Sequence, residues 1–472
     1  MTALIFTCAL SLLFFFWSLI FFKTYQLSQY QIGKFLDDIL AFRFAFGDKN
    51  KVVWTKRLVR FSILYFLVSF GLFFVVTYFI YHIALIVLNV IVVFLLAPIL
   101  MSVVHYIILP LEMLIKKIYI LRARAKLNKK NIIKIGITGS FGKTSTKNIL
   151  TSILEKQYKV CSTPLNYNTE MGITKTVLGN LDDHDIFIAE MGARKRFDIA
   201  KVVSIVRPNI AILTSIGRAH LQSFKTLSEI EKTKYELCEN LSKDGKAIFN
   251  GDSKSTLKLY RKFVGNKFLT NTEKAFAYAK NVQCSHDGSK FDLVLDGKEF
   301  KTSTRLLGKC NIDNIVTAAA CAYLLDVPAK HIVDAIKMLE PTPHRLEILS
   351  KTPIVIDDSY NSNEVGFSQA LEVLSKFSGK KIVVTPGIVE LGKEQKSVNF
   401  KIGCQIADVA DFIVIMNEIN KNDIYSGAIS HNFNSKNIFF ANTRKKQEEI
   451  LKLLVNEKSV VLFENDLPDN YK

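Results

Sequence analysis

The strongest candidate site is the string GITGSFGKTSTK, residues 136–147, in which glycines precede a lysine and hydroxyl side chains. Glycines let backbone N–H groups approach phosphate oxygens, and the lysine can neutralise the β- and γ-phosphates. The threonine hydroxyl directly after the lysine can ligate Mg²⁺. The spacing G-x-x-G-K-T is shorter than usual, because Ile137 stands where the common phosphate loop has its first glycine. The expected ATP-binding residues of this loop are Gly139, Ser140, Gly142, Lys143, Thr144 and Ser145.

Three further polar side chains follow apolar segments that are typical of buried strands. Glu190 ends the segment DIFIAE, His220 follows RPNIAILTSIGRA, and Asp358 ends PIVIDD. Side chains at the carboxyl ends of parallel strands meet at one edge of a sheet, where ligands bind. Taken alone, His220 could equally be a satisfied polar residue, and the Asp-Asp pair would also suit a transport ATPase.

The segments around these residues predict an α/β fold for the chain after residue 131. Residues 131–137 form a short, mostly apolar run, and residues 144–154 can continue as a helix. Strand, glycine loop and helix is the order that a phosphate-binding loop needs. Strands and helices alternate in the same way further along the chain, which favours parallel sheets.

The first 115 residues contain three long apolar stretches. Residues 2–22 and 61–80 carry no charged side chain, and each is close to the roughly 20 residues that a membrane-spanning helix needs. A third stretch runs from about residue 83 past Pro98 to about residue 109, so we expect three transmembrane helices. The alternative for residues 2–22 is a signal peptide, but a basic start and a small-residue cleavage site are missing.

The basic residues of the chain gather beside these apolar stretches. The formal net charge is +19, and residues 1–130 contain 15 Lys and Arg against four Asp and Glu. Most of these cations lie within residues 23–60 and 116–130, which indicates that both segments are cytoplasmic. The N-terminus is then outside, the connection at residues 81–82 lies on the same far side, and the part after residue 131 is cytoplasmic. The excess charge therefore does not require a nucleic-acid partner.

The seven cysteines are scattered, odd in number and form no C-x-x-C pair. This pattern argues against a disulfide framework or a zinc site, both of which need paired or closely spaced cysteines. It favours a reducing compartment, which agrees with a cytoplasmic location for most of the chain.

The loop sequence T-G-x-x-G-K-T-S resembles that of the Mur ligase family, the ATP-dependent enzymes that form amide bonds in peptidoglycan synthesis. Further motifs similar to the family's follow over about residues 131–472. In chain order they are STPLNYNTEMGITKTVL (162–178), DIFIAEMGAR (185–194), the Ile-Gly-x-Ala-His element ending at residue 220, EIEKTKYELCENL (229–241), LLGKCNIDNIVTAAACAYLL (306–325), PTPHRLEIL (341–349) and DDSYNSN (357–363). This chain departs from the family at Phe197-Asp198, where Gly-Glu is usual, at Cys310, where His is usual, and at Glu364, where Pro is usual.

The resemblance implies a role for each matching residue. ATP would be bound by the glycine loop together with Asn314, Arg345 and Asp358. Two Mg²⁺ ions would be held by Thr144, Glu190, His220 and a carbamylated Lys234, although sequence alone would make Lys234 a surface-helix lysine. The residues implied in catalysis are Lys143, His220, Lys234 and Arg345. The residues implied in substrate binding are Asn166, Asn168, Thr169, Asn361 and Asn363.

The resemblance also implies a reaction. ATP would phosphorylate the terminal carboxylate of UDP-N-acetylmuramoyl-tripeptide, and the amine of D-alanyl-D-alanine would attack the acyl phosphate. The string DDSYNSN resembles the variant of its motif in the branch that adds this dipeptide. One alternative is another membrane-bound ligase of this kind, similar to a polyglutamate synthase. The other is a transport ATPase, against which the missing LSGGQ-type sequence and the loop spacing argue.

The implied organisation has three parts. Residues 1–125 form a membrane region, residues 126–342 a P-loop-type α/β domain that binds ATP, and residues 343–472 a Rossmann-like α/β domain. The family's soluble UDP-binding domain is replaced here by the apolar stretches, which place the chain at the bacterial inner (cytoplasmic) membrane. Either this region anchors an ordinary ligase in membrane lipid near other cell-wall synthesis enzymes, or the enzyme acts on a lipid-linked muramoyl acceptor.

Overall fold

The computed structural model describes residues 2–41, 52–79, 95–129, 131–165, 167–218, 221–360 and 362–467. The chain divides into two compact units, Met1–Tyr119 and Ile120–Lys472. The boundary falls inside helix α5 (Ala97–Lys129), whose last residues therefore belong to the second unit.

The first unit is helical, with α1 (Thr2–Leu27), α2 (Ile32–Leu40), α3 (Lys56–Phe79) and the first part of α5. Within the described ranges, α1, α3 and α5 are long and apolar enough to cross a membrane, and three such helices were expected. Helix α5 continues to Lys129 instead of ending near residue 109, since its basic end consists largely of good helix formers. The expected start of the third stretch, residues 83–94, and the connection at residues 81–82 lie outside the described residues.

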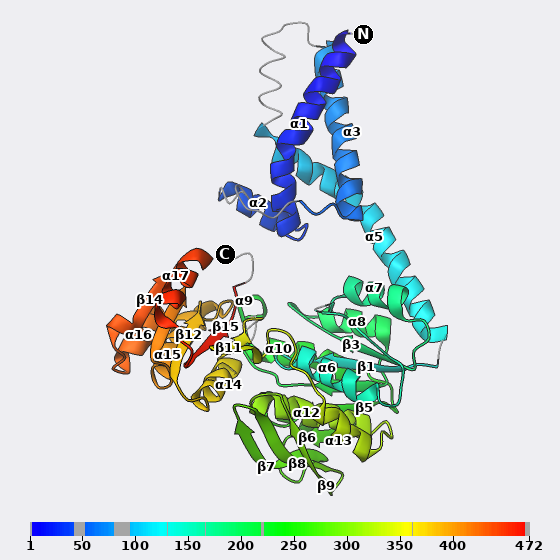
Figure 1. Ribbon diagram of the computed structural model, residues 1–472. Helices are drawn as coiled ribbons and strands as arrows, with labels where there is room; N and C mark the ends of the chain where they lie inside the picture. The colour runs from blue at the N-terminus through cyan, green and yellow to red at the C-terminus, as the bar shows by residue number, and fades with distance from the viewer. Residues whose placement is uncertain are drawn as a thin grey trace. The chain divides into compact units, whose positions relative to one another are not determined.

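Polar side chains inside the first unit are paired. Helices α1 and α3 run side by side (Figure 1), and the hydroxyl groups of Ser18 and Tyr65 lie 2.7 Å apart between them. Arg60 of α3 donates two hydrogen bonds to the carboxylate of Glu112 in α5, at 2.6 and 2.8 Å. Such pairing is needed in an apolar bundle, where an unsatisfied polar group costs free energy.

The second unit contains a nine-stranded sheet and a six-stranded sheet. The strand order of the larger sheet is β2-β3-β1-β4-β5-β6-β7-β8-β9, parallel up to β7 and antiparallel over β7–β9. Its strands are β1 (Ile133–Thr138), β2 (Val160–Ser162), β3 (Ile186–Glu190), β4 (Ile210–Leu213), β5 (Lys246–Asn250), β6 (Asn266–Thr270), β7 (Ala277–Ser285), β8 (Gly288–Leu295) and β9 (Lys298–Thr304).

Both faces of the parallel part of this sheet are covered by helices, as its continuous apolar strands require. Successive strand residues alternate between the faces, so that Ile186 and Ile188 enter one core while Phe187 and Ala189 enter the other. The first core includes residues of α6 (Lys143–Leu154), α12 (Lys309–Tyr323) and α13 (Ala329–Lys337). The second includes residues of α7 (Glu170–Asn180), α8 (Asp198–Val206), α9 (Leu221–Phe224), α10 (Leu227–Glu239), α11 (Lys254–Lys262) and the end of α5.

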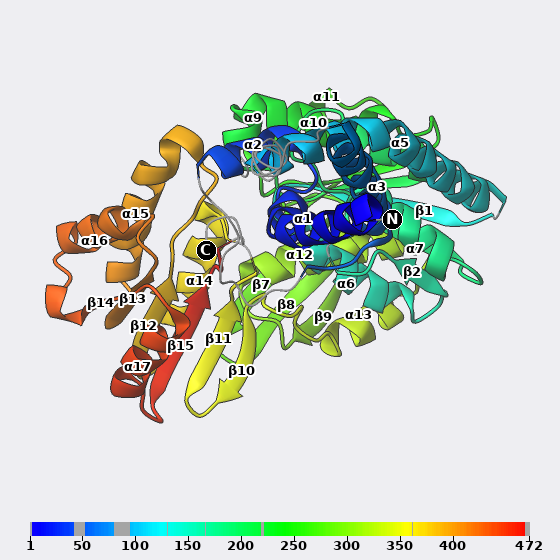
Figure 2. The ribbon, with the colours of Figure 1, turned by 90° about the horizontal axis from the view of Figure 1, so that it is seen from above.

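The smaller sheet has the order β10-β11-β15-β12-β13-β14, in which only β10 is antiparallel to its neighbour (Figure 2). Its strands are β10 (Glu347–Lys351), β11 (Ile354–Asp358), β12 (Lys380–Thr385), β13 (Phe412–Met416), β14 (Ile438–Ala441) and β15 (Ser459–Glu464). The helices are α14 (Glu364–Ser375), α15 (Gln395–Ala407) and α16 (Lys421–Ser430) on one core and α17 (Arg444–Leu454) on the other, with short turns η1 (Gly392–Glu394) and η2 (Ser435–Asn437). The α/β fold predicted for this part of the chain is confirmed.

Candidate active site

The glycine loop joins the carboxyl end of β1 to the start of α6. Gly139 has φ 156°, and a Cβ atom there would lie 2.0 Å from Thr214 Oγ1. Gly142 has φ 77°, and its Cβ would lie 2.5 Å from Asn314 Oδ1. Both positions therefore require glycine. No side chain of the described residues caps the N-terminus of α6, which leaves the positive end of the helix dipole available to an anion.

Lys143 is the first residue of α6 and folds back over this loop. Its Nζ donates hydrogen bonds to the carbonyl oxygens of Gly139 at 2.9 Å and Ser140 at 3.0 Å. Desolvation lowers the pKa of Lys143, Glu190 opposes this shift, and the positive charge of Arg345 adds to it. The ammonium group thus lacks a full counter-charge, and a phosphate placed at the loop would supply one.

Glu190 is the centre of a buried network at the end of β3, with only 2% of its surface exposed. Thr144 Oγ1 donates to its Oε2 at 2.9 Å, and Asn168 Nδ2 donates to its Oε1 at 3.2 Å. The ammonium of Lys147 lies 3.6 Å from Oε2 and also donates to the carbonyl oxygen of Thr163 at 2.7 Å. The network joins the glycine loop to the segment that carries the predicted substrate residues.

Lys234 lies on α10 and is buried, with 4% exposure, rather than on a helix surface as the bare sequence would suggest. Burial lowers the pKa of Lys234 to about 7, and the positive charge of Lys143 contributes to this. Two residues further on, Glu236 accepts the backbone N–H groups of Phe197 at 2.8 Å and Ala200 at 2.9 Å. Because these groups begin α8, Glu236 fixes α10 against α8 and so helps to position Lys234.

A second set of polar groups comes from the smaller sheet. Asp358 ends β11, and its Oδ1 accepts the backbone N–H of Leu346 at 3.3 Å. Burial raises the pKa of Asp358 to about 6, although the nearby Arg345 lowers it. The guanidinium of Arg345 lies 4.7 Å from the ring centroid of Tyr360. Asn363 begins α14 and accepts the backbone N–H groups of its first turn at 2.9 and 3.1 Å.

These groups face one cavity of about 390 Å³ between the carboxyl ends of the two sheets. It is lined by the following predicted residues: Gly139, Ser140, Gly142, Lys143, Thr144, Ser145, Asn168, Glu190, Lys234, Asn314, Arg345, Asp358 and Asn363. Thr169 does not line it, because its Oγ1 accepts the N–H of Gly172 at the start of α7. Asn166, His220 and Asn361 lie outside the described residues.

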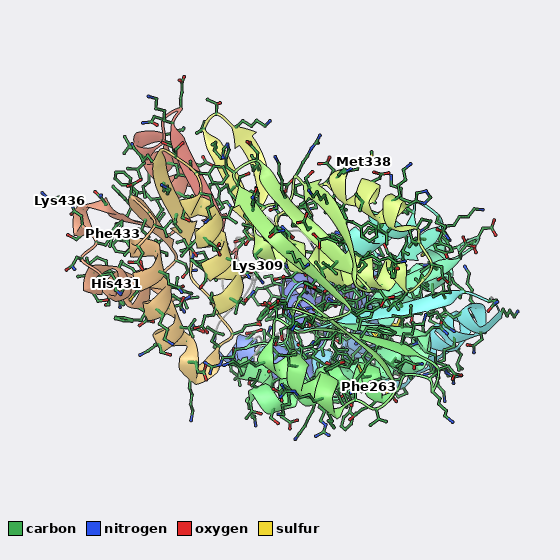
Figure 3. All side chains as sticks on the ribbon, turned by 90° about the horizontal axis from the view of Figure 1, so that it is seen from below. Phe263, Lys309, Met338, His431, Phe433 and Lys436 are labelled. Carbon is green, nitrogen blue, oxygen red and sulfur yellow. The ribbon has the colours of Figure 1, made fainter. Side chains whose placement is uncertain are left out.

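The start of α12 adds Asp313 to the same cavity, and Lys309 contacts this carboxyl group from outside the lining. Lys309 (Figure 3) lies with its Nζ 2.9 Å from Asp313 and 3.4 Å from Asp252, which joins α12 to the loop after β5. Burial raises the pKa of Asp313 to about 6 in spite of this lysine. One residue further along the helix, Asn314 Oδ1 accepts a hydrogen bond from Thr146 Oγ1 at 3.2 Å. This places Asn314 against the glycine loop.

Two buried residues were not singled out from the sequence. Lys147 lies four residues after Lys143, on the same face of α6, and this helical spacing was a usable signal. Glu464 ends β15 with 1% exposure, and it belongs to the string LFENDLPDNY near the C-terminus. The string does not show that Glu464 is paired, because its neighbour Asp358 is more than 100 residues away in the chain.

Comparisons with known proteins agree with this architecture. A model of the Mur ligase middle domain matches residues 137–322. The UDP-N-acetylmuramoyl-tripeptide–D-alanyl-D-alanine ligase of Buchnera aphidicola subsp. Baizongia pistaciae is 31% identical over 353 residues, 72% of this chain and 77% of the relative. The ligase of the same description from Buchnera aphidicola subsp. Acyrthosiphon pisum is 31% identical over 336 residues, 70% of this chain and 72% of the relative.

A solved structure of similar fold is the MurF ligase of Thermotoga maritima in complex with ADP. It is 26% identical and has a TM-score of 0.68, with 74% of this chain and 80% of that chain covered. The likeness therefore extends over both sheets of the second unit and is not confined to the glycine loop. The chain belongs to the Mur ligase family, within its group of UDP-N-acetylmuramoyl-tripeptide–D-alanyl-D-alanine ligases.

Proposed function

We propose that this protein is an ATP-dependent ligase that joins D-alanyl-D-alanine to UDP-N-acetylmuramoyl-tripeptide through an acyl phosphate. One observation carries the proposal. The glycine loop, with its uncapped helix N-terminus, faces the same cavity as Arg345 and Asp358 of the smaller sheet's side. The names of the relatives give the substrates of those proteins, and family membership supports the same substrates here.

ATP fits the residues that line the cavity. The absent Cβ atoms of Gly139 and Gly142, the free end of α6 and the incompletely balanced charge of Lys143 all suit a polyphosphate. We assign residues 126–342 to a P-loop-type domain that binds the phosphates and residues 343–472 to a Rossmann-like domain. From the latter, Arg345 would contact phosphate and Asp358 the rest of the nucleotide, while Asn314 would lie on the adenine side.

Mg²⁺ also fits the donors present. Thr144 Oγ1 and Glu190 Oε2 are oxygen ligands of the kind that Mg²⁺ prefers, and they already lie 2.9 Å apart. We assign the metal sites to Thr144, Glu190, His220 and a carbamylated Lys234. A lysine reacts with CO₂ as the neutral amine, and the pKa of about 7 favours that form of Lys234. Bound Mg²⁺ would neutralise charge on the phosphoryl oxygens during transfer.

Residues from both sides of the cavity take part in the two steps of the reaction. Lys143 and Arg345 would orient the γ-phosphate toward the substrate carboxylate, which is bound near Asn166, Asn168 and Thr169. The carboxylate oxygen attacks phosphorus and ADP leaves. The amine of the dipeptide, held near Asn361 and Asn363, then attacks the acyl carbon, inorganic phosphate leaves, and the nitrogen loses a proton. Closure of the C-terminal domain on the central domain would complete the site.

For the N-terminal region, residues 1–125, we propose a membrane anchor that leaves the catalytic domains in the cytoplasm. The three apolar helices and the basic segments beside them support this orientation. An anchored enzyme would meet membrane lipid and other cell-wall synthesis enzymes at the inner membrane. Efficient turnover of the soluble nucleotide substrate would favour the anchor, whereas a strict need for a polyprenyl-linked muramoyl peptide would favour a lipid-linked acceptor.

The decisive experiment is ADP release by the full-length protein in detergent or vesicles. We expect release only when ATP, Mg²⁺, UDP-N-acetylmuramoyl-tripeptide and D-alanyl-D-alanine are all present, with an equal amount of amide product. Replacing the dipeptide with glutamate tests the alternative of a polyglutamate synthase, because only that enzyme would release ADP with glutamate as the amine substrate. ADP release that ignores both carboxylate and amine substrates would contradict the proposal.

A further inference from the structure

Two acidic side chains lie side by side beneath the cavity. Asp358 and Glu464 end the neighbouring parallel strands β11 and β15 and are direct register partners. Their carboxyl groups are within hydrogen-bonding reach of one another. Asp358 lines the cavity, whereas Glu464 lies behind it with 1% exposure.

The hydrogen bonds around this pair leave one oxygen without a donor. Ser362 Oγ donates to Glu464 Oε1, and the N–H of Leu346 donates to Asp358 Oδ1. Glu464 Oε2 is buried, and no donor of the described residues reaches it. Two ionised carboxylates in this position would repel one another, and the oxygen would lack any hydrogen bond. A proton on Glu464 Oε2, donated to Asp358, removes both costs.

The charged and titratable groups around the pair agree with a single shared proton. The facing groups are Arg345 before β10, Asp357 on β11 and Cys310 on α12. Burial raises the pKa of the Cys310 thiol to about 12, so it carries no charge, and Asp357 lies 2.7 Å from His344 Nδ1. A pair with one proton has a charge of −1, which the guanidinium of Arg345 balances.

We propose that Glu464 is a positioning residue of the ligase site. Through a shared proton it holds Asp358 toward the nucleotide, and through Ser362 it holds that residue and its neighbour Asn363 for the incoming amine. This inference rests on the proposed function. According to it, Glu464 couples Asp358, which would contact ATP, to Ser362 and Asn363, which would lie near the incoming amine.

The substitution Glu464→Gln tests the shared proton directly. The amide can donate to Asp358 and accept from Ser362, as protonated Glu464 does, but it does not titrate. In wild-type protein the Kd of ATP, measured by calorimetry, should rise as the pH passes the pKa of the pair and the proton is lost. In the Glu464→Gln variant this rise should be absent. The same pH dependence in both proteins would overturn the proposal.

The substitution Glu464→Ala tests the positioning. It removes the contacts to both Asp358 and Ser362, so we expect the KM values of ATP and D-alanyl-D-alanine each to increase about tenfold or more, the size expected for a lost buried hydrogen bond to a charged group. Glu464→Gln should restore both. Unchanged KM values in a folded Glu464→Ala protein would contradict the inference, as would a Glu464→Gln variant that is no better than the alanine.

A spectroscopic readout separates this inference from the proposed function. Difference infrared spectra near neutral pH should show the C=O band of a buried protonated carboxyl group in wild type, and Glu464→Gln should remove it. The matched control Glu457→Gln changes an exposed acid and should leave the band and the KM values as they are. If wild type shows the band but forms no amide, only the proposed function fails. If amide forms and the band is missing, only the inference fails.

Discussion

The two walls of the cavity use the same architecture but enclose different titratable side chains, lysines in one and carboxylic acids in the other. Each is built at the carboxyl edge of a mostly parallel sheet, where loops carry the polar groups. The wall from the nine-stranded sheet contains Lys143 and Lys234, which line the cavity, and Lys147, which does not line it, and desolvation lowers the pKa of each. The wall from the six-stranded sheet contains Asp358, which lines the cavity, and Glu464 behind it, and burial raises the pKa of both.

This contrast shows how one enclosed space can serve two kinds of substrate group. Desolvated ammonium groups gain most from an anion, so the lysine wall suits phosphates and a substrate carboxylate. Desolvated acids that retain a proton can donate as well as accept hydrogen bonds, so the acid wall suits hydroxyl groups and an amine. Desolvation therefore gives each wall the protonation state that suits the substrate groups it would bind.

The largest effect is expected at the lysine wall. Lys143→Met keeps the length of the side chain but removes the charge over the glycine loop, so kcat should fall on the order of 10²–10³-fold. The measurement is steady-state ADP release, with Lys330→Met on the exposed start of α13 as the control. Activity within a few-fold of wild type would contradict the assignment of Lys143 to the phosphate site.

The next effect concerns Lys234. Lys234→Ala should lower kcat by about 10- to 100-fold, the range seen when groups that support a metal site are lost. A small carboxylate such as acetate should restore part of the activity, because it can occupy the space of a carbamate. Rescue by acetate but not by a small amine would support the carbamate, and rescue by the amine alone would support a free lysine.

A smaller, substrate-specific effect is expected at Lys147. Lys147→Met breaks the hydrogen bonds to the carbonyl oxygens of Thr163 and Leu165. The segment that leads to Asn168 is then no longer fixed, so the KM of the muramoyl substrate should rise about tenfold. The KM of the dipeptide should change little, because the acid wall is intact. Equal changes in both KM values would argue against separate roles for the walls.

The walls should also respond to pH in opposite directions. The Asp358–Glu464 pair binds its shared proton more tightly in the folded state, where the pKa of Asp358 is about 6 against 3.8, so this contribution to stability is lost as the pH rises between these values. Lys234, with a pKa of about 7 against 10.5, is neutral in the folded state, so stability increases with pH over that interval. Thermal melting in CO₂-depleted buffer should show the first slope reduced in Glu464→Gln and the second reduced in Lys234→Met. Parallel slopes in all three proteins would contradict this contrast.

The smallest effect is expected at the rim. Arg218 and Glu394 form an ion pair of 2.8 Å between loops of the two walls, but both side chains are about half exposed. Exposed pairs contribute roughly 0–1 kcal/mol, so Arg218→Gln should change kcat/KM by less than about fivefold. If Arg218→Gln lowered activity as much as Lys143→Met, this ion pair, and not the groups that line the cavity, would control the closure of the two sides on one another.

The lysine wall was largely predictable from the sequence because its elements are local. The glycine loop, its flanking strand and the helix after it occupy one continuous segment, and Glu190 ends a recognisable apolar strand. The burial of Lys234 was not predictable, since it depends on helices α8 and α10 packing over the sheet. The burial of Lys147 was not predictable either, since it depends on contacts with the segment after β2. Sequence patterns give the face of a helix that is buried but not how deeply a long side chain is enclosed.

The acid wall was less predictable because its key pair depends on strand order. Asp358 followed from the motif at the end of β11, yet its partner comes from β15, which is inserted between β11 and β12. A sequence does not state which strand occupies the middle of a sheet, and therefore not which strand ends are neighbours. The same limit applies to α5, whose basic end could be either a loop or a helix from its sequence and is fixed as a helix by its packing on the second unit.

The packing of α5 sets where the second unit can be cut from the apolar helices of the first. Ala123 and Leu127, near the end of this helix, are buried in the same core as Ile132 and α7. A soluble fragment that starts just before the glycine loop would expose this core, whereas one that starts at Ile120 would keep it covered. The end of α5 is thus part of the core of the second unit, so limited proteolysis should release an active, non-sedimenting ligase only when cleavage falls before Ile120.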